Sequence, residues 1–221
     1  MTCLAELLEQ VGRGMPLPAT GAVTLLPGPA GHAVAAVLGF TAHHVIAAAA
    51  DADAEWLESR LGGHEMTRPM KAGFLAALGE HLEAVPGGQD TLLVACGGSA
   101  LTGRDDITVL ENPAELKHPR VDRAQRYRTD VRVATMPGGL VTIGRGLAGR
   151  WEVSIEVEAA FRGAGVSRAL ADCARTLVPT GAVLWAQVHP ANVPSLRAFL
   201  AAGYRPVGAE VLLARESAGP R

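Results

Sequence analysis

The chain has 221 residues, of which 48% are hydrophobic and 4% aromatic, and its formal net charge is -2. This composition excludes a protein that is disordered throughout, because it supplies enough apolar surface for a core. The length suits one large domain or two small ones. A core built mainly from Ala, Val and Leu favours closely packed helices and strands.

The two halves of the chain carry opposite charge. Residues 1–117 hold 6 basic and 14 acidic side chains, whereas residues 118–221 hold 14 basic and 8 acidic ones. An arginine-rich second half suits a polyanionic ligand, and two solvated halves that attract each other explain the asymmetry equally well. Nucleic acid is not expected as a partner, because the chain has no basic run and few aromatic residues to stack on bases.

Three widely spaced cysteines, Cys3, Cys96 and Cys173, form no CxxC pair. They favour a reducing compartment over a disulfide framework or a structural zinc site, and the seven histidines show no ligand spacing. The N-terminus lacks the basic region of a signal peptide. Polar residues interrupt the most apolar stretch, 33–50, which makes it a poor membrane span. We therefore expect a cytoplasmic protein without a membrane span or a metal site.

Residues 1–105 combine helical and strand patterns. The expected elements are, in chain order, a helix over 4–11, short strands over 22–26, 33–38 and 45–48, a helix that includes 56–61, a helix from Pro69 to Leu82 and a strand over 91–95. The segment 97–103 is the best linker candidate, because it is rich in glycine. We therefore predict an N-terminal α/β region over 1–105, to which no motif assigns a role, and a second domain over 106–221.

The second half has a more regular pattern. Its expected elements are a helix over 119–127, a hairpin over 131–135 and 140–143, a strand over 151–157, a helix over 165–177, a strand over 182–188, a helix over 193–201 and a strand over 204–213. From residue 131 onward the order is β-β-β-α-β-α-β, which indicates a mixed α/β fold.

The sequence from Gly144 to Gly149 spells GxGxxG after a predicted strand. A dinucleotide site requires a helix that begins inside this loop and directs its N-terminus at the pyrophosphate. Here the alternating pattern of 151–157 predicts a strand instead. The glycines therefore indicate a hairpin connection, and no nicotinamide site is expected.

A second glycine-containing turn lies between the predicted strand 151–157 and the helix 165–177. Its residues are Arg162, Gly163, Ala164, Gly165, Val166 and Ser167. Glycine lets backbone N–H groups approach a ligand closely, and a helix N-terminus adds unpaired donors and the positive end of a dipole. The pattern suits a pyrophosphate cradle, and an ordinary strand-to-helix turn is the alternative.

A further pattern follows the strand 182–188. Its residues are Asn192, Ser195, Phe199, Gly203 and Tyr204. Together with the turn at 162–167, this pattern resembles the GCN5-related N-acetyltransferases, in which Gln/Arg-x-x-G-x-G/A precedes an Asn-containing helix at similar internal spacing. The resemblance covers about residues 131–213 and fades upstream of Arg120. It implies a mixed, mostly antiparallel α/β sheet flanked by helices.

The resemblance also implies a function: an acyl-CoA-dependent N-acyltransferase, with acetyl-CoA as donor and an amine of a small molecule or a protein as acceptor. The residues that it assigns to donor binding are Ile155, Val157, Arg162, Gly163, Ala164, Gly165, Val166, Ser167 and Asn192. Backbone groups around 155 and 157 would pair with pantetheine, and those of 163–167 would bind the diphosphate. The N–H near Val157 would stabilise the oxyanion of the tetrahedral intermediate.

The chain departs from the family pattern at both expected catalytic positions. Phe199 stands where the family often has a tyrosine acid, so either Tyr204, Ser195 or water replaces it, or the thiolate leaves unassisted. The glutamate base often lies early in the strand 151–157, where the aligned residue is Trp151 and Glu152 is one position away. Glu152 and Tyr204 are the catalytic candidates.

Glu156 and His189 are further candidates for the base.

The departures from the family pattern at the two catalytic positions keep a second hypothesis open, an acetyl-CoA-binding protein of this fold without catalysis. A third is a regulatory protein whose first half binds another protein. Residues 1–105 would be a degenerate copy of the fold or an addition that supplies the acceptor pocket or a dimer surface. The arginines at 120, 123, 126 and 128 would meet CoA phosphates or an acidic acceptor, or form a solvated helix face.

Overall fold

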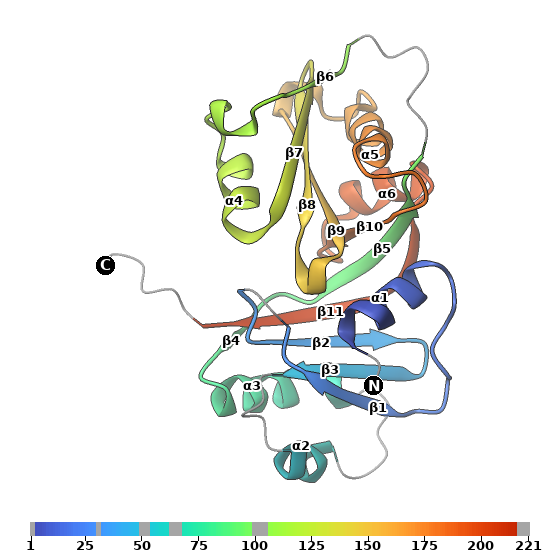
Figure 1. Ribbon diagram of the computed structural model, residues 1–221, viewed down its shortest axis with the longest axis vertical. Coiled ribbons are helices and arrows are strands. Elements are labelled where there is room, and N and C mark those ends of the chain that lie inside the picture. The colour runs from blue at the N-terminus through green and yellow to red at the C-terminus, as the bar shows by residue number, and fades with distance from the viewer. Residues whose placement is uncertain (1–2, 30–31, 49–53, 62–67, 99–105, 216–221) are drawn as a thin grey trace. The chain divides into compact units, whose positions relative to one another are not determined.

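The computed structural model describes residues 3–29, 32–48, 54–61, 68–98 and 106–215 (Figure 1). The chain divides into two compact units. The first comprises Met1–Thr91 and Val207–Arg221, and the second comprises Leu92–Pro206. No helix in the described parts is long and apolar enough to cross a membrane.

The first unit has a sheet with helices packed against it. Its elements are α1 (Leu4–Gly12), β1 (Val23–Pro27), β2 (Ala35–Phe40), β3 (His43–Ala48), α2 (Ala54–Leu61), α3 (Ala72–His81), β4 (Val85–Pro86) and most of β11 (Arg205–Ala214). β3 pairs parallel with β1 and antiparallel with β2, and β11 pairs antiparallel with β2 and β4. The three strands and the first two helices predicted in this half are confirmed, whereas the helix predicted from Pro69 to Leu82 begins at Ala72 and ends at His81, and Pro69 lies in a separate 3-10 turn, Arg68–Met70.

Apolar spacing explains how α3 joins the core of the first unit. Phe74, Leu75 and Leu78 recur at helical intervals, and all three are buried in one cluster with Ile46 of β3 and Val211 of β11. The cluster therefore joins residues from distant parts of the sequence.

The second unit contains a larger sheet. Its elements are β5 (Asp90–Cys96), β6 (Thr108–Val109), α4 (Pro119–Tyr127), β7 (Thr129–Met136), β8 (Gly139–Arg145), β9 (Trp151–Val157), α5 (Val166–Thr176), β10 (Val183–Val188) and α6 (Val193–Ala201). The strand order is β5-β10-β9-β8-β7-β6. Strands β6 to β9 pair antiparallel in succession, and β9 pairs parallel with β10. The predicted mixed, mostly antiparallel sheet is confirmed.

Side-chain alternation on β9 separates the two faces of this sheet. Trp151 and Val153 are buried in one core cluster with Leu170 of α5. Glu152, the residue between them, points to the opposite face, where Arg128 at the end of α4 bonds to it. Helices α5 and α4 therefore cover opposite faces (Figure 1).

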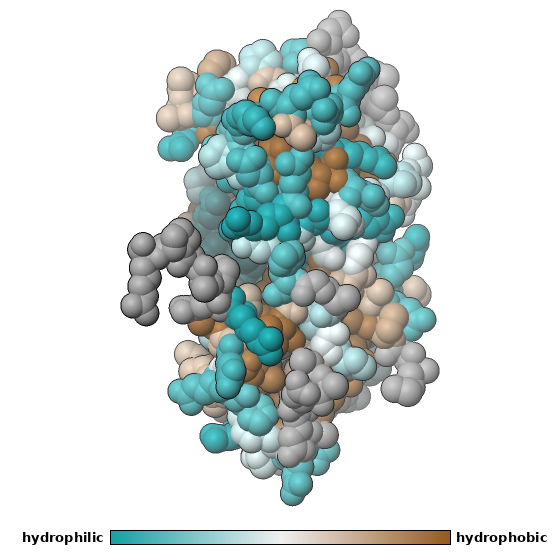
Figure 2. All heavy atoms as spheres, turned by 60° about the vertical axis from the view of Figure 1, so that its left-hand side comes forward, coloured by the Kyte–Doolittle hydropathy of each residue, from teal (hydrophilic) through white to brown (hydrophobic). Residues whose placement is uncertain are grey.

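The outer face of α4 is polar. Val121 and Ala124 are buried under the helix, whereas Asp122, Arg123 and Arg126 are exposed. Figure 2 brings the α4 side of the second unit forward and shows mainly hydrophilic residues over it. This pattern is that of an amphipathic helix lying on a sheet.

The glycines from 144 to 149 connect two strands, as predicted. Gly144 belongs to β8, a short turn of 3-10 helix follows at Leu147–Gly149, and β9 begins at Trp151. A Cβ atom on Gly146 would lie 2.3 Å from Cδ of Glu152, so glycine is required where the chain passes a buried carboxylate. The turn is therefore packed against a side chain of its own sheet.

The two compact units are not separated at a single point of the sequence, and the domain boundary after residue 105 stays a prediction. β5 passes from the first unit into the second at Leu92, and the chain returns to the first unit within β11. Most of the linker candidate 97–103 lies outside the described residues. Composition marks where a chain can turn, but the packing of strands into sheets decides which segments share a core.

Candidate functional site

Two parallel strands of the second unit, β9 and β10, stop pairing with each other before either strand ends. The pairing of β9 with β10 runs from Trp151 and Leu184 to Val153 and Ala186. β9 continues for four more residues, up to Val157, while still paired with β8. Beyond Val153, this part of β9 therefore directs one row of backbone N–H and C=O groups away from β8, toward the gap.

The residues predicted to face a ligand in this gap lie on that part of β9. Ile155 and Val157 are half-buried, in contrast to the fully buried Val153 just before them. A part of a strand that its neighbour no longer pairs is suited to an extended, amide-containing ligand, which can pair as an added strand would.

The glycine turn follows directly at the end of β9. A 3-10 turn at Ala159–Phe161 leads to Arg162, and α5 begins at Val166 with Gly165 as its N-cap. Gly163 and Gly165 have φ values of 84° and 82°, in the left-handed region that glycine adopts without strain. The structure thus explains both glycines of the motif.

The surface in front of this turn is open. A Cβ atom built on Gly163 or Gly165 would meet nothing within 4 Å, and residues 162–165 are exposed. The N-cap residue of α5, Gly165, has no side chain to cap the helix, whereas Nδ1 of His118 caps α4 and Oδ1 of Asn192 caps α6. The first N–H groups of a helix lack intrahelical partners. Those of α5 therefore suit an anion, and the residues present fit a diphosphate.

Asn192, predicted to contact the cofactor, has a structural contact here. Its Oδ1 accepts from the N–H of Ser195 at 3.3 Å, and its own N–H donates to the carbonyl of His189 at 2.8 Å. Both bonds form the start of α6. The position of Asn192 in the motif is thus that of a helix N-cap, and its contact with a cofactor stays a prediction.

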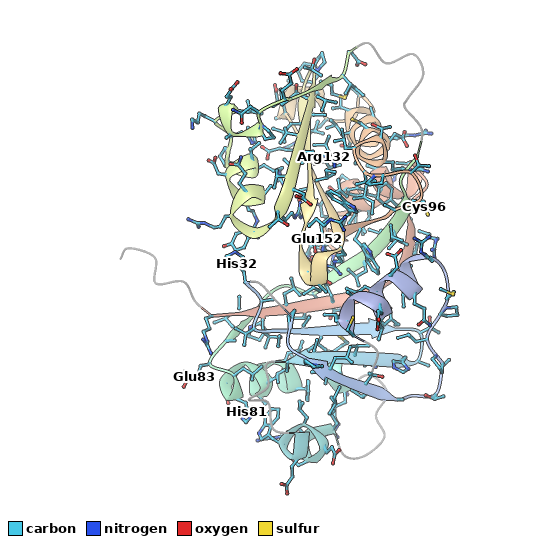
Figure 3. The ribbon with its side chains drawn as sticks, in the orientation of Figure 1. His32, His81, Glu83, Cys96, Arg132 and Glu152 are labelled. Atoms are coloured by element: carbon cyan, nitrogen blue, oxygen red, sulfur yellow. The ribbon has the colours of Figure 1, made fainter. Side chains whose placement is uncertain are left out.

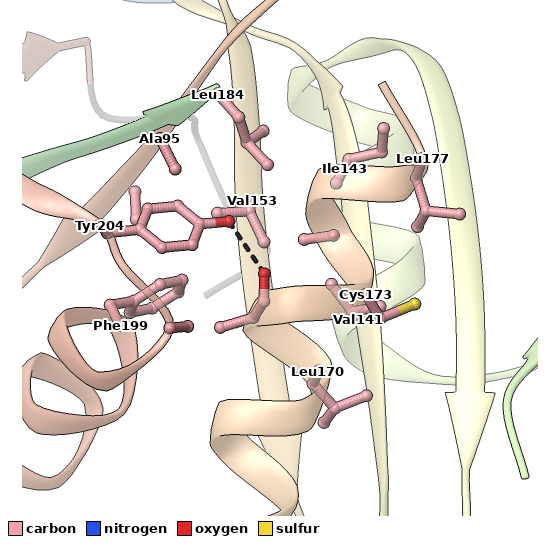
Figure 4. Close-up of a cluster of buried hydrophobic side chains, with 14 of the residues drawn as sticks. Ala95, Val141, Ile143, Val153, Leu170, Cys173, Leu177, Leu184, Phe199 and Tyr204 are labelled. Carbon is pink, nitrogen blue, oxygen red and sulfur yellow. Dashed lines mark hydrogen bonds between the residues drawn. The ribbon is translucent and has the colours of Figure 1, made fainter. Parts of the chain in front are cut away.

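Tyr204, one of the two catalytic candidates, lies in the core (Figure 4). It is 2% exposed, and its ring meets that of Phe199 edge-on with centroids 4.9 Å apart. Its hydroxyl donates to the carbonyl oxygen of Ala171 in α5 at 3.1 Å. Burial raises the pKa of this hydroxyl above its ordinary value. These contacts favour a packing role.

We expect Tyr204→Phe to destabilise the protein by about 1 kcal/mol, because it removes one buried hydrogen bond while keeping the ring. Urea unfolding monitored by circular dichroism measures this loss. If Tyr204 is instead the general acid, kcat falls by about 100-fold or more and the pH–rate profile changes. Such a profile would contradict the packing role.

Glu152, the other catalytic candidate, is buried in an ion-pair network on the α4 face of β9 (Figure 3). Oε1 accepts from Nε of Arg150 at 2.9 Å and from the N–H of Leu147 at 3.2 Å, and Oε2 accepts from Nε of Arg128 at 3.2 Å. Arg128 also donates to Oγ of Ser154. The network ties the end of α4 and the β8–β9 connection to β9.

The charges in this network set the protonation of Glu152. Burial pushes its pKa upward, but the guanidinium groups of Arg150 and Arg128 and the hydrogen bonds to the carboxylate hold the pKa below its ordinary value. A general base for an amine needs a pKa raised toward neutrality. The geometry therefore favours a structural role for Glu152, in which its carboxylate holds Arg128 and Arg150 in place, over a role as general base.

Glu156 is the more exposed carboxylate on the same strand. Nε of Arg120 lies 2.7 Å from its Oε2, and Nε2 of His118 lies 3.7 Å from its Oε1. The hydrogen bond from Arg120 is the main cause that lowers the pKa of Glu156. His189 lies in the loop before α6, where its Nδ1 accepts from the N–H of Ala191 at 3.1 Å. The lowered pKa of Glu156 does not suit a general base.

The sequence patterns missed the partners of these glutamates. Arg128 lies 24 residues before Glu152, and Arg120 lies 36 residues before Glu156. The arginines of α4 were noted only as a cluster, for either a ligand or a solvated face. Alternation along β9 places both glutamates on one face, but no local signal shows that α4 covers that face.

No protein-family model matches the sequence, and no curated protein matches it. The solved structures similar to this chain include a GCN5-related N-acetyltransferase from Kribbella flavida, with 16% identity, a TM-score of 0.43 and coverage of 66% of this chain and 65% of that one. Another, from Sphaerobacter thermophilus, has 15% identity, a TM-score of 0.39 and coverage of 64% and 56%.

A tandem GNAT protein from the clavulanic acid biosynthesis pathway is similar at 15% identity and a TM-score of 0.37, with coverage of 66% of this chain and 59% of that one. This chain thus spans less than two thirds of each of these three solved chains. Several of the solved structures to which this chain is similar are therefore GCN5-related N-acetyltransferases.

Proposed function

We propose that the second unit binds acetyl-CoA and transfers its acetyl group to an amine. The observation that carries this proposal is the position of two features at one end of β9. The strand leaves β10 after Val153, and the exposed glycine turn at the start of α5 follows the end of the same strand. A ligand with an extended amide arm and a diphosphate would engage both features at once.

The proposed contacts use mainly backbone. Groups around Ile155 and Val157 would pair with the pantetheine amides, and the N–H groups of 163–167 would bind the diphosphate. Arg162, which is exposed, adds a positive charge next to the turn. Backbone recognition of this kind depends on chain shape more than on side-chain identity, which fits a motif whose essential residues are glycines.

The proposed reaction is direct attack. The lone pair of the amine nitrogen forms a bond to the thioester carbonyl carbon, the C–S bond of the intermediate breaks, and the sulfur takes the electron pair. The nitrogen loses one proton, and the thiolate gains one. Because Glu152 lies in an ion-pair network, we favour water as the acceptor of the proton from nitrogen, and because the hydroxyl of Tyr204 lies in the core, we favour water as the donor of the proton to the thiolate.

The same two contacts favour a second candidate function. A protein that binds acetyl-CoA without turnover would keep the glycine turn and the parted strands and would not need a free base or acid. The ion pairs of Glu152 and the buried hydroxyl of Tyr204 are compatible with this role. A cytoplasmic location, expected from the cysteines, belongs to both proposals.

Thiol release separates the candidates. The protein is incubated with acetyl-CoA and a panel of small amines and peptides, with a chromogenic thiol reagent and mass spectrometry of the products. We expect thiol release that depends on an amine and yields its acetylated form. Binding of CoA in calorimetry without release would support the second candidate, and no binding at millimolar CoA would contradict both.

A further inference from the structure

The tip of the β7–β8 hairpin contacts the residue that precedes the glycine turn. A Cβ atom on Gly138 would lie 2.1 Å from Cγ and 2.4 Å from Cδ1 of Phe161. Gly138 is buried although it lies in a tight turn, and its φ of 83° also requires glycine. The ring of Phe161 thus rests directly on the backbone of Gly138, and the residue remains 37% exposed.

The same hairpin tip contacts the residues that follow the glycine turn. A Cβ atom on Gly139 would lie 2.8 Å from Cδ1 of Leu170 and 3.1 Å from Cγ1 of Val166, the first residue of α5. The carbonyl of Gly138 accepts from the N–H of Glu158 at 2.9 Å. The tip therefore holds both ends of the turn, Phe161 just before it and Val166 just after it.

The residues between these two ends have weak internal bonds. The N–H of Arg162 donates to Ala159 at 3.4 Å, and the N–H of Ala164 donates to Phe161 at 3.3 Å. Among the residues that the structure describes, no atom lies within 4 Å of a Cβ built on Gly163 or Gly165, so nothing supports these two glycines from outside. The shape of the turn is therefore set by the positions at which its two ends are held. A displacement of these ends would move the backbone groups proposed to bind the diphosphate, and a displacement of about 1 Å in a binding group is enough to impair a reaction strongly.

We infer that the hairpin tip at 137–139 positions the glycine turn at 162–167 for binding of the diphosphate. Phe161 is the positioning residue, and its ring packs on the backbone of Gly138. This inference rests on the proposed function and names the part of the chain that shapes the diphosphate site. The ring of Phe161 packs on Gly138, so the inferred effect of Phe161 on the diphosphate passes through the backbone of 162–165.

The test compares Gly138→Ala with Gly181→Ala. Gly181 has a φ of 79°, and a Cβ there would meet nothing within 4 Å, so its substitution adds the same backbone strain without displacing an aromatic ring. We expect Gly138→Ala to weaken CoA binding in calorimetry by about tenfold or more relative to Gly181→Ala. Binding of pantetheine, which has no diphosphate, should change equally little in both.

A second pair of variants, both at Phe161, tests the inference if Gly138→Ala does not fold. Phe161→Ala should weaken CoA binding as Gly138→Ala does, whereas Phe161→Tyr, which keeps the ring, should restore it. With an active preparation, the alanine variant should raise the KM for acetyl-CoA with little change in kcat. Equal CoA affinity for the alanine and tyrosine variants would overturn the inference, whereas failure of the unmodified protein to bind CoA would overturn the proposed function.

Discussion

Replacing Gly165 by aspartate is expected to abolish binding of CoA. The carboxylate would stand in the open space in front of the turn, where the proposal places a diphosphate. Like charges at short distance repel strongly in a partly desolvated site, and the φ of 82° adds local strain for any side chain. We expect the affinity for CoA to fall by more than about 100-fold, which corresponds to about 2.7 kcal/mol.

Gly181→Asp is the matched control for this substitution. It introduces the same charge and a closely similar backbone strain, since Gly181 also has positive φ and open space around its Cα, but it lies beyond the opposite end of α5. It should bind CoA like the unmodified protein. Titration calorimetry measures affinity, and circular dichroism verifies folding. If Gly165→Asp bound CoA with unchanged affinity, the diphosphate would have to bind elsewhere.

Glu152→Gln is expected to destabilise the protein strongly. The side chains of Arg150 and Arg128 are 3% and 12% exposed, and the substitution leaves both guanidinium groups without the carboxylate that neutralises them. Breaking a buried ion pair on one side costs about 3 kcal/mol or more. For a domain of this size, that loss lowers Tm by about 6–12 °C.

Glu156→Gln provides the control on the same strand and the same face. Its side chain is 44% exposed and its main partner, Arg120, is 34% exposed, so the solvent screens their interaction. Removal of such a pair changes stability by at most about 1 kcal/mol. Thermal unfolding of both variants measures the difference. Equal Tm values for Glu152→Gln and Glu156→Gln would contradict a stabilising role of the ion-pair network around Glu152. A Glu152→Gln variant that is stable but inactive would instead indicate that Glu152 is the base.

The depressed pKa of Glu152 also predicts a dependence on pH. The pKa in the folded protein lies below the value in the unfolded chain, which is about 4.3 for glutamate. The folded state therefore gains stability from this group above about pH 4.3 and loses it as the pH falls through the lower, folded pKa. Acid titration should narrow the stability gap between the unmodified protein and Glu152→Gln.

The sequence by itself determined the local structure of the second half. Alternation over 151–157, helical spacing over 165–177 and the glycines of the motif each report the conformation of a few adjacent residues, and β9, α5 and the turn between them were found where these patterns predict them. Such patterns are readable because backbone sterics and the alternation of side chains act over short distances along the chain.

Only the tertiary structure decided the surroundings of the side chains. Whether Glu152 is a base or a member of an ion-pair network depends on Arg128, which lies 24 residues earlier, directly after α4. Whether Tyr204 is a free acid depends on the carbonyl of Ala171, and Phe161 lies on Gly138 because the hairpin folds back toward α5. Burial and charge pairing arise between segments far apart in the chain, so no local pattern encodes them.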